Sequence, residues 1–247
     1  MKKIVLLAIM AVMSLTSQAQ IVSSRSSMVT REEAPKNGWS TFGFEYIPGS
    51  LSADKGTGRK TQSLTGFGIN WTKASSLTAD LPLFLEIGFG GQYTSFKYDF
   101  KISGYNFEQT GKMASVVVPL NLIYDYQIPN SNICIDPFIG IKARVNVWGE
   151  MTLKEDVPGY AVDEKYNIFD KDDMGDEDYV FGRFQLGWQI GVKARFANSF
   201  FVGVSYGSDF SNIVDKSVLL DEDASSGSSY LEKVKYNATT LSLGFVF

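Results

Sequence analysis

The sequence predicts an all-β fold, a transmembrane antiparallel up-and-down β-barrel of about eight strands. From Trp39 onward, apolar residues alternate with polar or small residues at a period of two, which indicates strands rather than helices. The breaks between the alternating runs are long after the first, third, fifth and seventh runs and short after the others. The last run ends on an aromatic residue, Phe247, with Leu241, Leu243 and Phe245 on the same face.

Each run has one apolar face and one polar or small face. The apolar faces lie within residues 42–46, 67–71, 83–89, 116–126, 133–147, 184–192, 200–206 and 241–247. After Gly90 and Gly91 the apolar parity switches to Phe96, Tyr98 and Phe100, so we expect a β-bulge at the two glycines. Near the ends of the runs lie aromatic residues that suit the membrane–water interface: Trp39, Trp71, Tyr124, Tyr126, Trp148 and Tyr206.

The alternation of long and short breaks predicts how the barrel is oriented. A barrel with both termini in the periplasm has short periplasmic turns and long extracellular loops. The alternative is a soluble lipocalin-like barrel, which would place its apolar residues inside. Such a barrel would need neither alternating break lengths nor a terminal aromatic residue, so the pattern favours the membrane protein.

The N-terminus has the pattern of a secretory signal peptide. Lys2 and Lys3 precede an apolar run over 4–15, and Ser17-Gln18-Ala19 is a small-x-small cleavage site. The run is too short for a membrane-spanning helix, which needs roughly 20 residues. We therefore predict a signal peptide over 1–19, a periplasmic N-terminal tail over 20–38 and the barrel domain over 39–247.

The chain contains no histidine. Ser-His-Asp and Cys-His catalysis and histidine-ligated metal sites are therefore excluded as they are usually built. We expect a protein that is not an enzyme and has no cofactor. Cys134 is the only cysteine, so no intramolecular disulfide can form. The net charge is −4 and no basic tract suggests nucleic acid.

Three segments carry a resemblance to a known class of membrane protein. They are Ala19-Gln20, Val117-Val118-Pro119-Leu120-Asn121-Leu122 and residues 241–247. The mature chain resembles the small porin-like outer-membrane β-barrels of bacteroidete-type bacteria, which include OmpA-, OmpX- and PorT-like members. The resemblance implies an integral protein of the cell outer membrane, in contact with lipid and lipopolysaccharide and inserted by the barrel assembly machinery. It also implies that Phe245 and Phe247 belong to a C-terminal assembly signal.

Charged residues lie on the polar faces of the runs, which we expect to face the lumen. The expected lumen cluster comprises Glu45, Glu86, Asp125, Asp136, Lys142, Arg144, Arg183 and Lys193. A barrel of about eight strands is only wide enough for side chains to fill it, and buried charges must be paired. The cluster is therefore either a salt-bridged plug that holds the barrel closed or a narrow polar pore for ions or small solutes.

The break after the fifth run, over 150–178, is rich in carboxylates. Clustered carboxylates suit Ca²⁺ or Mg²⁺, and the candidate ligands are Asp170, Asp172, Asp173, Asp176 and Asp178. The EF-hand pattern fails, because Met174 and Phe181 occupy its fifth and twelfth positions. The alternative is a solvated acidic loop that binds no metal.

Three functions remain open from the sequence. The leading hypothesis is a non-enzymatic outer-membrane barrel with a salt-bridged lumen. It would serve envelope integrity or surface interaction through its outer loops, and the sequence does not identify an extracellular ligand. The second hypothesis is a small porin for ions or small solutes. The third, an accessory barrel in protein secretion or assembly, is implied only by the resemblance to PorT-like members.

Overall fold

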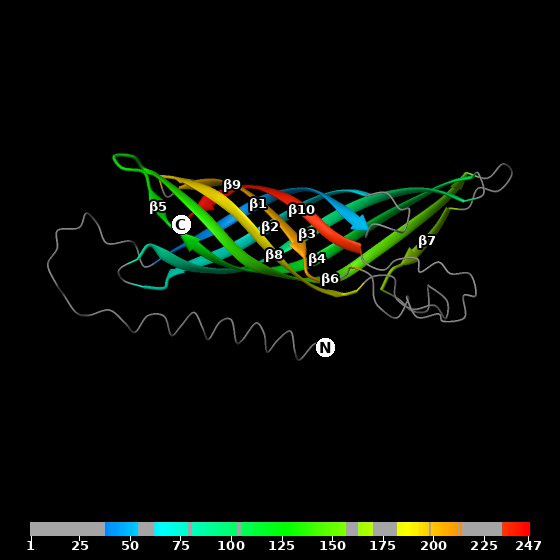
Figure 1. Ribbon diagram of the computed structural model, residues 1–247, viewed down its shortest axis with the longest axis horizontal. Helices are drawn as coiled ribbons and strands as arrows, with labels where there is room; N and C mark the ends of the chain where they lie inside the picture. Colours follow the sequence, from blue (N-terminus) through cyan, green and yellow to red (C-terminus); the bar gives the residue numbers. More distant parts are fainter. Residues whose placement is uncertain are drawn as a thin grey trace.

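The chain forms a single antiparallel sheet that closes on itself (Figure 1). The computed structural model describes residues 38–53, 62–78, 81–102, 105–156, 163–169, 182–197, 199–211, 213 and 234–247. The strands within these residues are β1 Gly38–Ala53, β2 Gln62–Ser76, β3 Leu83–Ile102, β4 Tyr105–Tyr124, β5 Tyr126–Gln127, β6 Ile133–Asp156, β7 Asp163–Asn167, β8 Phe184–Phe196, β9 Phe200–Asp209 and β10 Val234–Val246. The predicted signal peptide 1–19 lies outside the described residues, as does the predicted tail 20–38 apart from Gly38, which begins β1.

Eight long strands make the wall of the barrel. Their order is β4-β3-β2-β1-β10-β9-β8-β6, and β4 also pairs with β6, so the wall has no open edge along this closure. The two short strands β5 and β7 add to β6 at its two ends. The predicted fold class, an all-β antiparallel up-and-down barrel of about eight strands, is confirmed.

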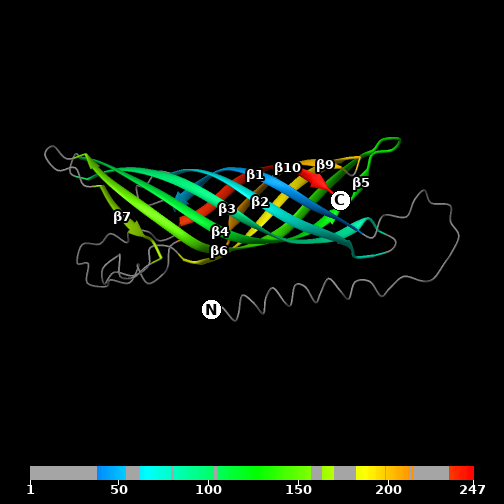
Figure 2. The ribbon, with the colours of Figure 1, turned by 180° about the vertical axis from the view of Figure 1, so that it is seen from behind.

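The two ends of the barrel differ. Strand β5 and the C-terminus lie at one end and β7 lies at the other, in both views (Figures 1 and 2). The start of β1 is at the same end as the C-terminus, because Ser40 and Phe247 exchange backbone hydrogen bonds of 2.8 and 3.0 Å. We call this the periplasmic end and the other the extracellular end, following the predicted orientation. Among the described residues, no helix has the length and apolar character needed to cross a membrane.

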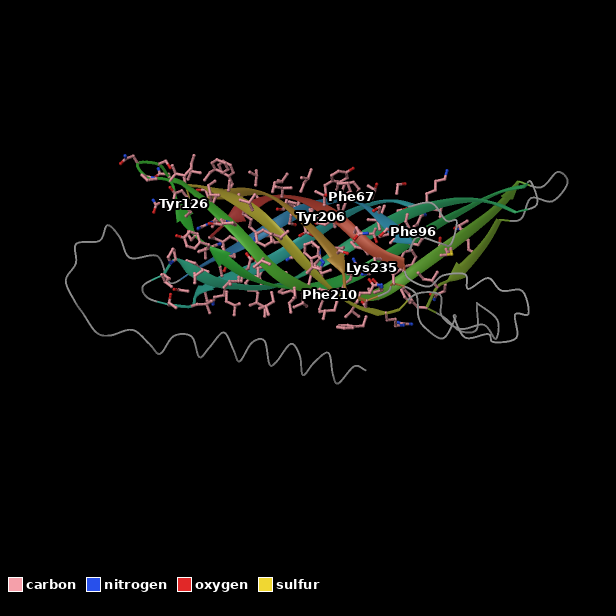
Figure 3. All side chains as sticks on the ribbon, in the orientation of Figure 1. Phe67, Phe96, Tyr126, Tyr206, Phe210 and Lys235 are labelled. Carbon is pink, nitrogen blue, oxygen red and sulfur yellow. The ribbon has the colours of Figure 1, made fainter. Side chains whose placement is uncertain are left out.

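Large apolar side chains cover the outer face of the wall. Phe67 is 62% exposed, Phe89 59% and Leu243 61%, and Figure 3 shows Phe67 and Tyr206 on this face. Along β3 the outward apolar positions extend from Leu83 to Tyr93. About ten residues at roughly 3.3 Å each, on a strand tilted by about 40°, span roughly 25 Å, which matches the apolar band of an outer-membrane barrel. We call this surface the apolar belt.

The register of the wall shifts at a different place from the one that the sequence predicts. Strand β3 keeps one register with its neighbours across Gly90 and Gly91, so the predicted bulge is wrong. Phe96 is buried inside the barrel, because the extracellular part of the interior is itself apolar. The shift lies between Ala114 and Ser115 of β4, whose partners on β6 are Trp148 and Asn146, so Val147 is the extra residue.

The predicted long break after the third run is also wrong. Strands β3 and β4 continue pairing up to Ile102 and Tyr105, so most of this segment is strand. Beyond the lipid a hairpin needs no apolar outer face, so its sequence does not alternate as the membrane-spanning part does. The hairpin therefore extends the wall on the extracellular side, together with β6 and β7.

Candidate functional site

The candidate site is the interior of the barrel, and its periplasmic end holds an ion-pair cluster. Arg195 on β8 donates to Asp136 through Nε at 2.5 Å and through Nη2 at 3.1 Å, and to Asp125 at 2.8 Å. Its guanidinium lies over the ring of Trp39, 3.6 Å from the centroid. Trp39 also packs against Phe84, with ring centroids 4.5 Å apart, and is partly buried. It therefore does not lie among the aromatic residues at the membrane–water interface, where the sequence predicts it.

An apolar layer closes the interior next to this cluster. Its members are the buried side chains Ala74, Phe84, Ile123 and Phe138, with Trp39 packed against them. Strand β8 of the wall lies close to this layer. A β-carbon on Gly191 would lie 2.7 Å from the ring of Phe138, so glycine at this position makes room for the ring. The layer separates the periplasmic mouth from the polar middle of the barrel.

The middle of the interior contains a buried ion pair. Lys193 Nζ donates to Glu86 Oε1 at 2.8 Å and to Oε2 at 2.5 Å. Asn121 donates to Oε1 at 2.8 Å and Thr72 to Oε2 at 2.9 Å, so each carboxylate oxygen accepts two hydrogen bonds. Glu86 is 0% exposed. Such complete pairing is what a buried charge requires.

A small polar cavity lies beside this pair. Glu45 accepts hydrogen bonds from Asn70 at 2.6 Å and from Gln92 at 2.7 Å, and these three residues line the cavity together with Lys142. Its volume is about 40 Å³, enough for a few water molecules. Within the described part of the chain, Asn70 Oδ1 and Gln92 Oε1 have no hydrogen-bond partner, so both are acceptors that such waters would satisfy.

A second buried ion pair lies nearer the extracellular end. Arg144 on β6 pairs with Asp209 on β9, and Arg144 Nε donates to Gln185 Oε1 at 2.7 Å. The guanidinium also lies 3.8 Å from the centroid of the Tyr236 ring. Arg144, Asp209 and Gln185 are all buried. The pair therefore cross-links three strands of the wall from inside.

An apolar cluster fills the extracellular end of the interior above this pair. Its members are Ile47, Leu51, Leu64, Phe96, Met113, Met151, Ile168, Phe169, Ile213, Tyr236 and Ala238. Ile168 and Phe169 follow β7, and Ile213 follows β9, so segments beyond the wall fold back into its mouth. We call these three residues the plug residues. Ile168 is 0% exposed, Phe169 3% and Ile213 0%.

The shifted register of β6 makes the place for the plug residues. After the extra residue Val147, Gly149 faces inward. A β-carbon on Gly149 would lie 2.5 Å from Ile168 and 2.7 Å from Phe169. Gly149 also accepts a backbone hydrogen bond from Ile168 at 3.3 Å. The bulge and the glycine together let the segment after β7 pack against the wall.

The structure brings the charged residues predicted for the lumen together only in part. Glu86 and Lys193 pair directly, Asp125 and Asp136 share Arg195, and Glu45 and Lys142 line one cavity. Arg144 lies inside but pairs with Asp209, which the sequence interpretation did not include. Arg183 is exposed at the extracellular rim instead of lining the lumen, because it precedes β8 and donates to the Phe169 carbonyl at 3.0 Å.

Sequence reasoning missed three interior groups: Arg195, Asp209 and Tyr236. The first two could have been found from strand parity. Arg195 shares the inward face of Lys193, and Asp209 continues the inward face of Gly203, Ser205 and Gly207. Both lie beyond the predicted apolar faces, which end at Val192 and Tyr206, although in β8 the alternation continues through Ala194 and Phe196. Tyr236 carries no such signal, because aromatic residues mark the outer face elsewhere in the wall.

Two other predicted groups can be placed only in part. The candidate metal ligands Asp170, Asp172, Asp173, Asp176 and Asp178 lie outside the described residues. Within the described ranges, no group of three or more acidic, cysteine or histidine side chains could hold a metal ion. Phe245 and Phe247 face outward, 61% and 67% exposed, and their role as an assembly signal stays a prediction.

Comparison with known proteins finds solved structures that are similar to this chain. No protein-family model and no curated protein matches the chain. Among solved structures, Ail, the attachment invasion locus protein of Yersinia pestis, is 15% identical with a TM-score of 0.40, over 86% of this chain and 100% of that one. Neisserial surface protein A is 13% identical with a TM-score of 0.38, over 84% and 97% of the two chains. The outer membrane enzyme PagL is 13% identical with a TM-score of 0.34, over 81% and 97%. At these identities the likeness concerns the fold alone.

Proposed function

We propose that this chain is a non-enzymatic integral protein of the bacterial outer membrane, whose barrel is closed and whose role lies at the cell surface. It serves envelope integrity or surface interaction through its extracellular end. The observation that carries the proposal is the layered interior, in which two apolar layers enclose a set of paired charges. The absence of histidine from the sequence supports the non-enzymatic part.

The layered interior favours this function over a porin. A solute that crossed the barrel would have to pass the apolar layer around Phe84 and the plug residues. Between them it would have to separate the buried ion pairs Glu86–Lys193 or Arg144–Asp209, which cross the interior from different strands. The polar space beside the first pair has a volume of about 40 Å³, enough for a few water molecules.

Planar-bilayer recordings of the refolded mature protein test the closed barrel. We expect no steady conductance from the wild type at moderate voltage. Stable channels that change size in Arg144→Ala, but not in the outer-face variant Lys73→Ala, would show a porin and contradict the proposal. Lys73 is the control because it is a basic residue on the outer face of β2 that does not line the interior.

The envelope role is tested in cells. Deletion of the gene is expected to raise sensitivity to detergent, and expression of the wild type should restore resistance. Unchanged sensitivity would count against the role in envelope integrity.

The same proposal includes the partners that the sequence suggests, namely outer-membrane lipid, lipopolysaccharide and the barrel assembly machinery, in a host of the bacteroidete type.

A further inference from the structure

Glu45 fixes the orientation of the two amide side chains beside it. Asn70 Nδ2 donates to Glu45 Oε1 at 2.6 Å, and Gln92 Nε2 donates to Oε2 at 2.7 Å. A carboxylate only accepts hydrogen bonds, so the amide nitrogens must face it and the amide oxygens must point elsewhere. Both side chains line the polar cavity, and among the described residues their oxygens have no hydrogen-bond partner. Gln92 is only 4% exposed, and a buried oxygen of this kind needs a donor.

Glycines on β1 and β2 leave room for these polar groups. A β-carbon on Gly43 would lie 3.1 Å from Asn70 Oδ1. A β-carbon on Gly68 would lie 3.0 Å from Glu45 Oε2 and 3.0 Å from Gln92 Cγ. Any larger residue at either position would press on the polar side chains. The two glycines therefore keep the acceptor side of the cavity open.

Lys142 on β6 brings hydrogen-bond donors to the same cavity. Its side chain lines the cavity, and among the described residues no hydrogen bond or ion pair involves its ammonium group. Of the charged groups around it, Glu45 has the strongest electrostatic interaction with it, ahead of Arg144 and Asp209. Lys142 and Glu45 nevertheless form no direct ion pair. An ammonium group with three N–H donors inside a barrel needs acceptors close by.

The charges that line the cavity favour a neutral occupant. Its carboxylates are Glu45 and Glu86 and its ammonium groups are those of Lys142 and Lys193, so the lining has no net charge. A cation would be repelled by Lys142, and an anion would be repelled by Glu45. The occupant must accept from an ammonium group and donate to amide oxygens, within a volume of about 40 Å³. Water does both, and a few molecules fit.

We propose that Lys142 and Glu45 form an ion pair that is bridged by ordered water molecules in this cavity. The waters accept hydrogen bonds from Lys142 Nζ, and they donate to the two amide oxygens and to the carboxylate of Glu45. The bridge connects β6 with β1, β2 and β3 through the interior. It lies inside the barrel and is independent of the proposed role at the cell surface.

A crystal structure of the refolded mature protein tests the bridge directly. The expected result is ordered water within hydrogen-bond distance of Lys142 Nζ and of the amide oxygens of Asn70 and Gln92. A direct contact between Lys142 and Glu45, a metal ion or another ion in the cavity, or a cavity without ordered water would each overturn the proposal.

Hydroxyl-radical footprinting in detergent tests the bridge in solution, because radicals formed from a buried water modify the side chains next to it. Phe201 lines the cavity and is 2% exposed, whereas Phe84 is 1% exposed and belongs to the apolar layer. Bulk solvent reaches the two rings to a similarly small extent. We therefore expect Phe201 to be oxidised several times faster than Phe84.

Lys142→Met distinguishes the bridge from a cavity that holds water without it. Fewer waters should stay ordered without the ammonium group, so oxidation of Phe201 should fall severalfold. Lys73→Met, on the outer face of β2, should leave this oxidation unchanged. Equal oxidation of Phe201 and Phe84 in the wild type, or an unchanged rate at Phe201 in Lys142→Met, would contradict the proposal. Heat-dependent gel mobility shows whether each variant forms the barrel, and the wild-type crystal structure decides if Lys142→Met does not fold.

Discussion

Glu86 shows at the scale of one residue what holds the interior together. Its carboxylate is fully buried, and all of its hydrogen-bond donors come from other strands: Thr72 on β2, Asn121 on β4 and Lys193 on β8. Lys193 alone supplies the compensating charge, with its ammonium also 5.4 Å from the centroid of the Phe138 ring. Removing that charge while leaving the carboxylate in place should therefore be costly.

We predict that Lys193→Met lowers the free energy of unfolding by about 3–5 kcal/mol. The physical reason is that Glu86 stays buried without a cation. The double variant Lys193→Met with Glu86→Gln should recover most of the loss, because no buried charge remains unpaired. Urea unfolding in detergent micelles, followed by tryptophan fluorescence, measures all three proteins.

An exposed lysine is the control for this experiment. Lys73 lies on the outer face of β2, and Lys73→Met should change the free energy of unfolding by no more than about 0.5 kcal/mol. If Lys193→Met also changed the free energy of unfolding by no more than about 0.5 kcal/mol, the Glu86–Lys193 pair would contribute little to stability. The explanation of the closed interior by paired charges would then fail.

At the scale of the element, β6 is the strand that shapes the extracellular end. Its extra residue at Val147 turns Gly149 inward, and the plug residues Ile168 and Phe169 pack on that glycine. Arg183 holds the same segment from the rim, with its guanidinium 5.1 Å from the centroid of the Phe169 ring. A larger side chain at Gly149 would have to displace the segment.

We predict that Gly149→Leu expels the segment after β7 from the barrel mouth. Phe169 would then become accessible, and chymotrypsin should cut after it in the variant but not in the wild type, where it is 3% exposed. Mass spectrometry of the fragments identifies the cut. Gly91→Leu is the matched control, because a β-carbon at that glycine meets nothing within 4 Å. If chymotrypsin did not cut Gly149→Leu after Phe169, the segment would pack on the wall despite the leucine side chain, and the prediction would be wrong.

The same strands show how far the sequence determines the wall. The alternation of apolar with polar or small residues predicted the outer face wherever the strand contacts lipid, as in Phe67–Trp71 on β2. It misplaced the bulge, because Phe96 was assigned to the lipid face on its apolar character although the extracellular interior is also apolar. The true shift at Val147 is invisible to the pattern, since valine and the following Trp148 both suit the outer face.

At the scale of the whole molecule, the membership of the interior was predictable only in part, and the pairing of its charges was not predictable. The acids and bases on the polar faces could be recognised one strand at a time. Their partners could not, because Glu86 and Lys193 are 107 residues apart and Arg144 and Asp209 are 65 apart. Closure of the sheet through the pairing of β4 with β6 brings Glu86 on β3 and Lys193 on β8 together across the lumen, whereas Arg144 and Asp209 lie on β6 and β9 with β8 between them. The layering of apolar and charged groups along the axis likewise needs the register of all eight strands.

The seam between β1 and β10 carries the last prediction. Phe247 holds the seam through its backbone, by the bonds with Ser40, while its side chain is 67% exposed. Phe247→Ala keeps the backbone bonds, so we expect refolding in detergent to be unchanged. If the side chain is an assembly signal, the fraction of folded barrel in the outer membrane of cells should fall severalfold, as measured by heat-dependent gel mobility.

Phe210→Ala is the control for this prediction, because Phe210 is also an exposed aromatic residue, 57% exposed, but lies at the extracellular end. Its loss should leave assembly in cells unchanged. Equal assembly of Phe247→Ala and the wild type would show that the terminal ring is only part of the apolar belt. A defect in both variants, or a refolding defect of Phe247→Ala in detergent, would place the effect in barrel stability, because recognition by the assembly machinery acts only in cells and only through the terminal strand.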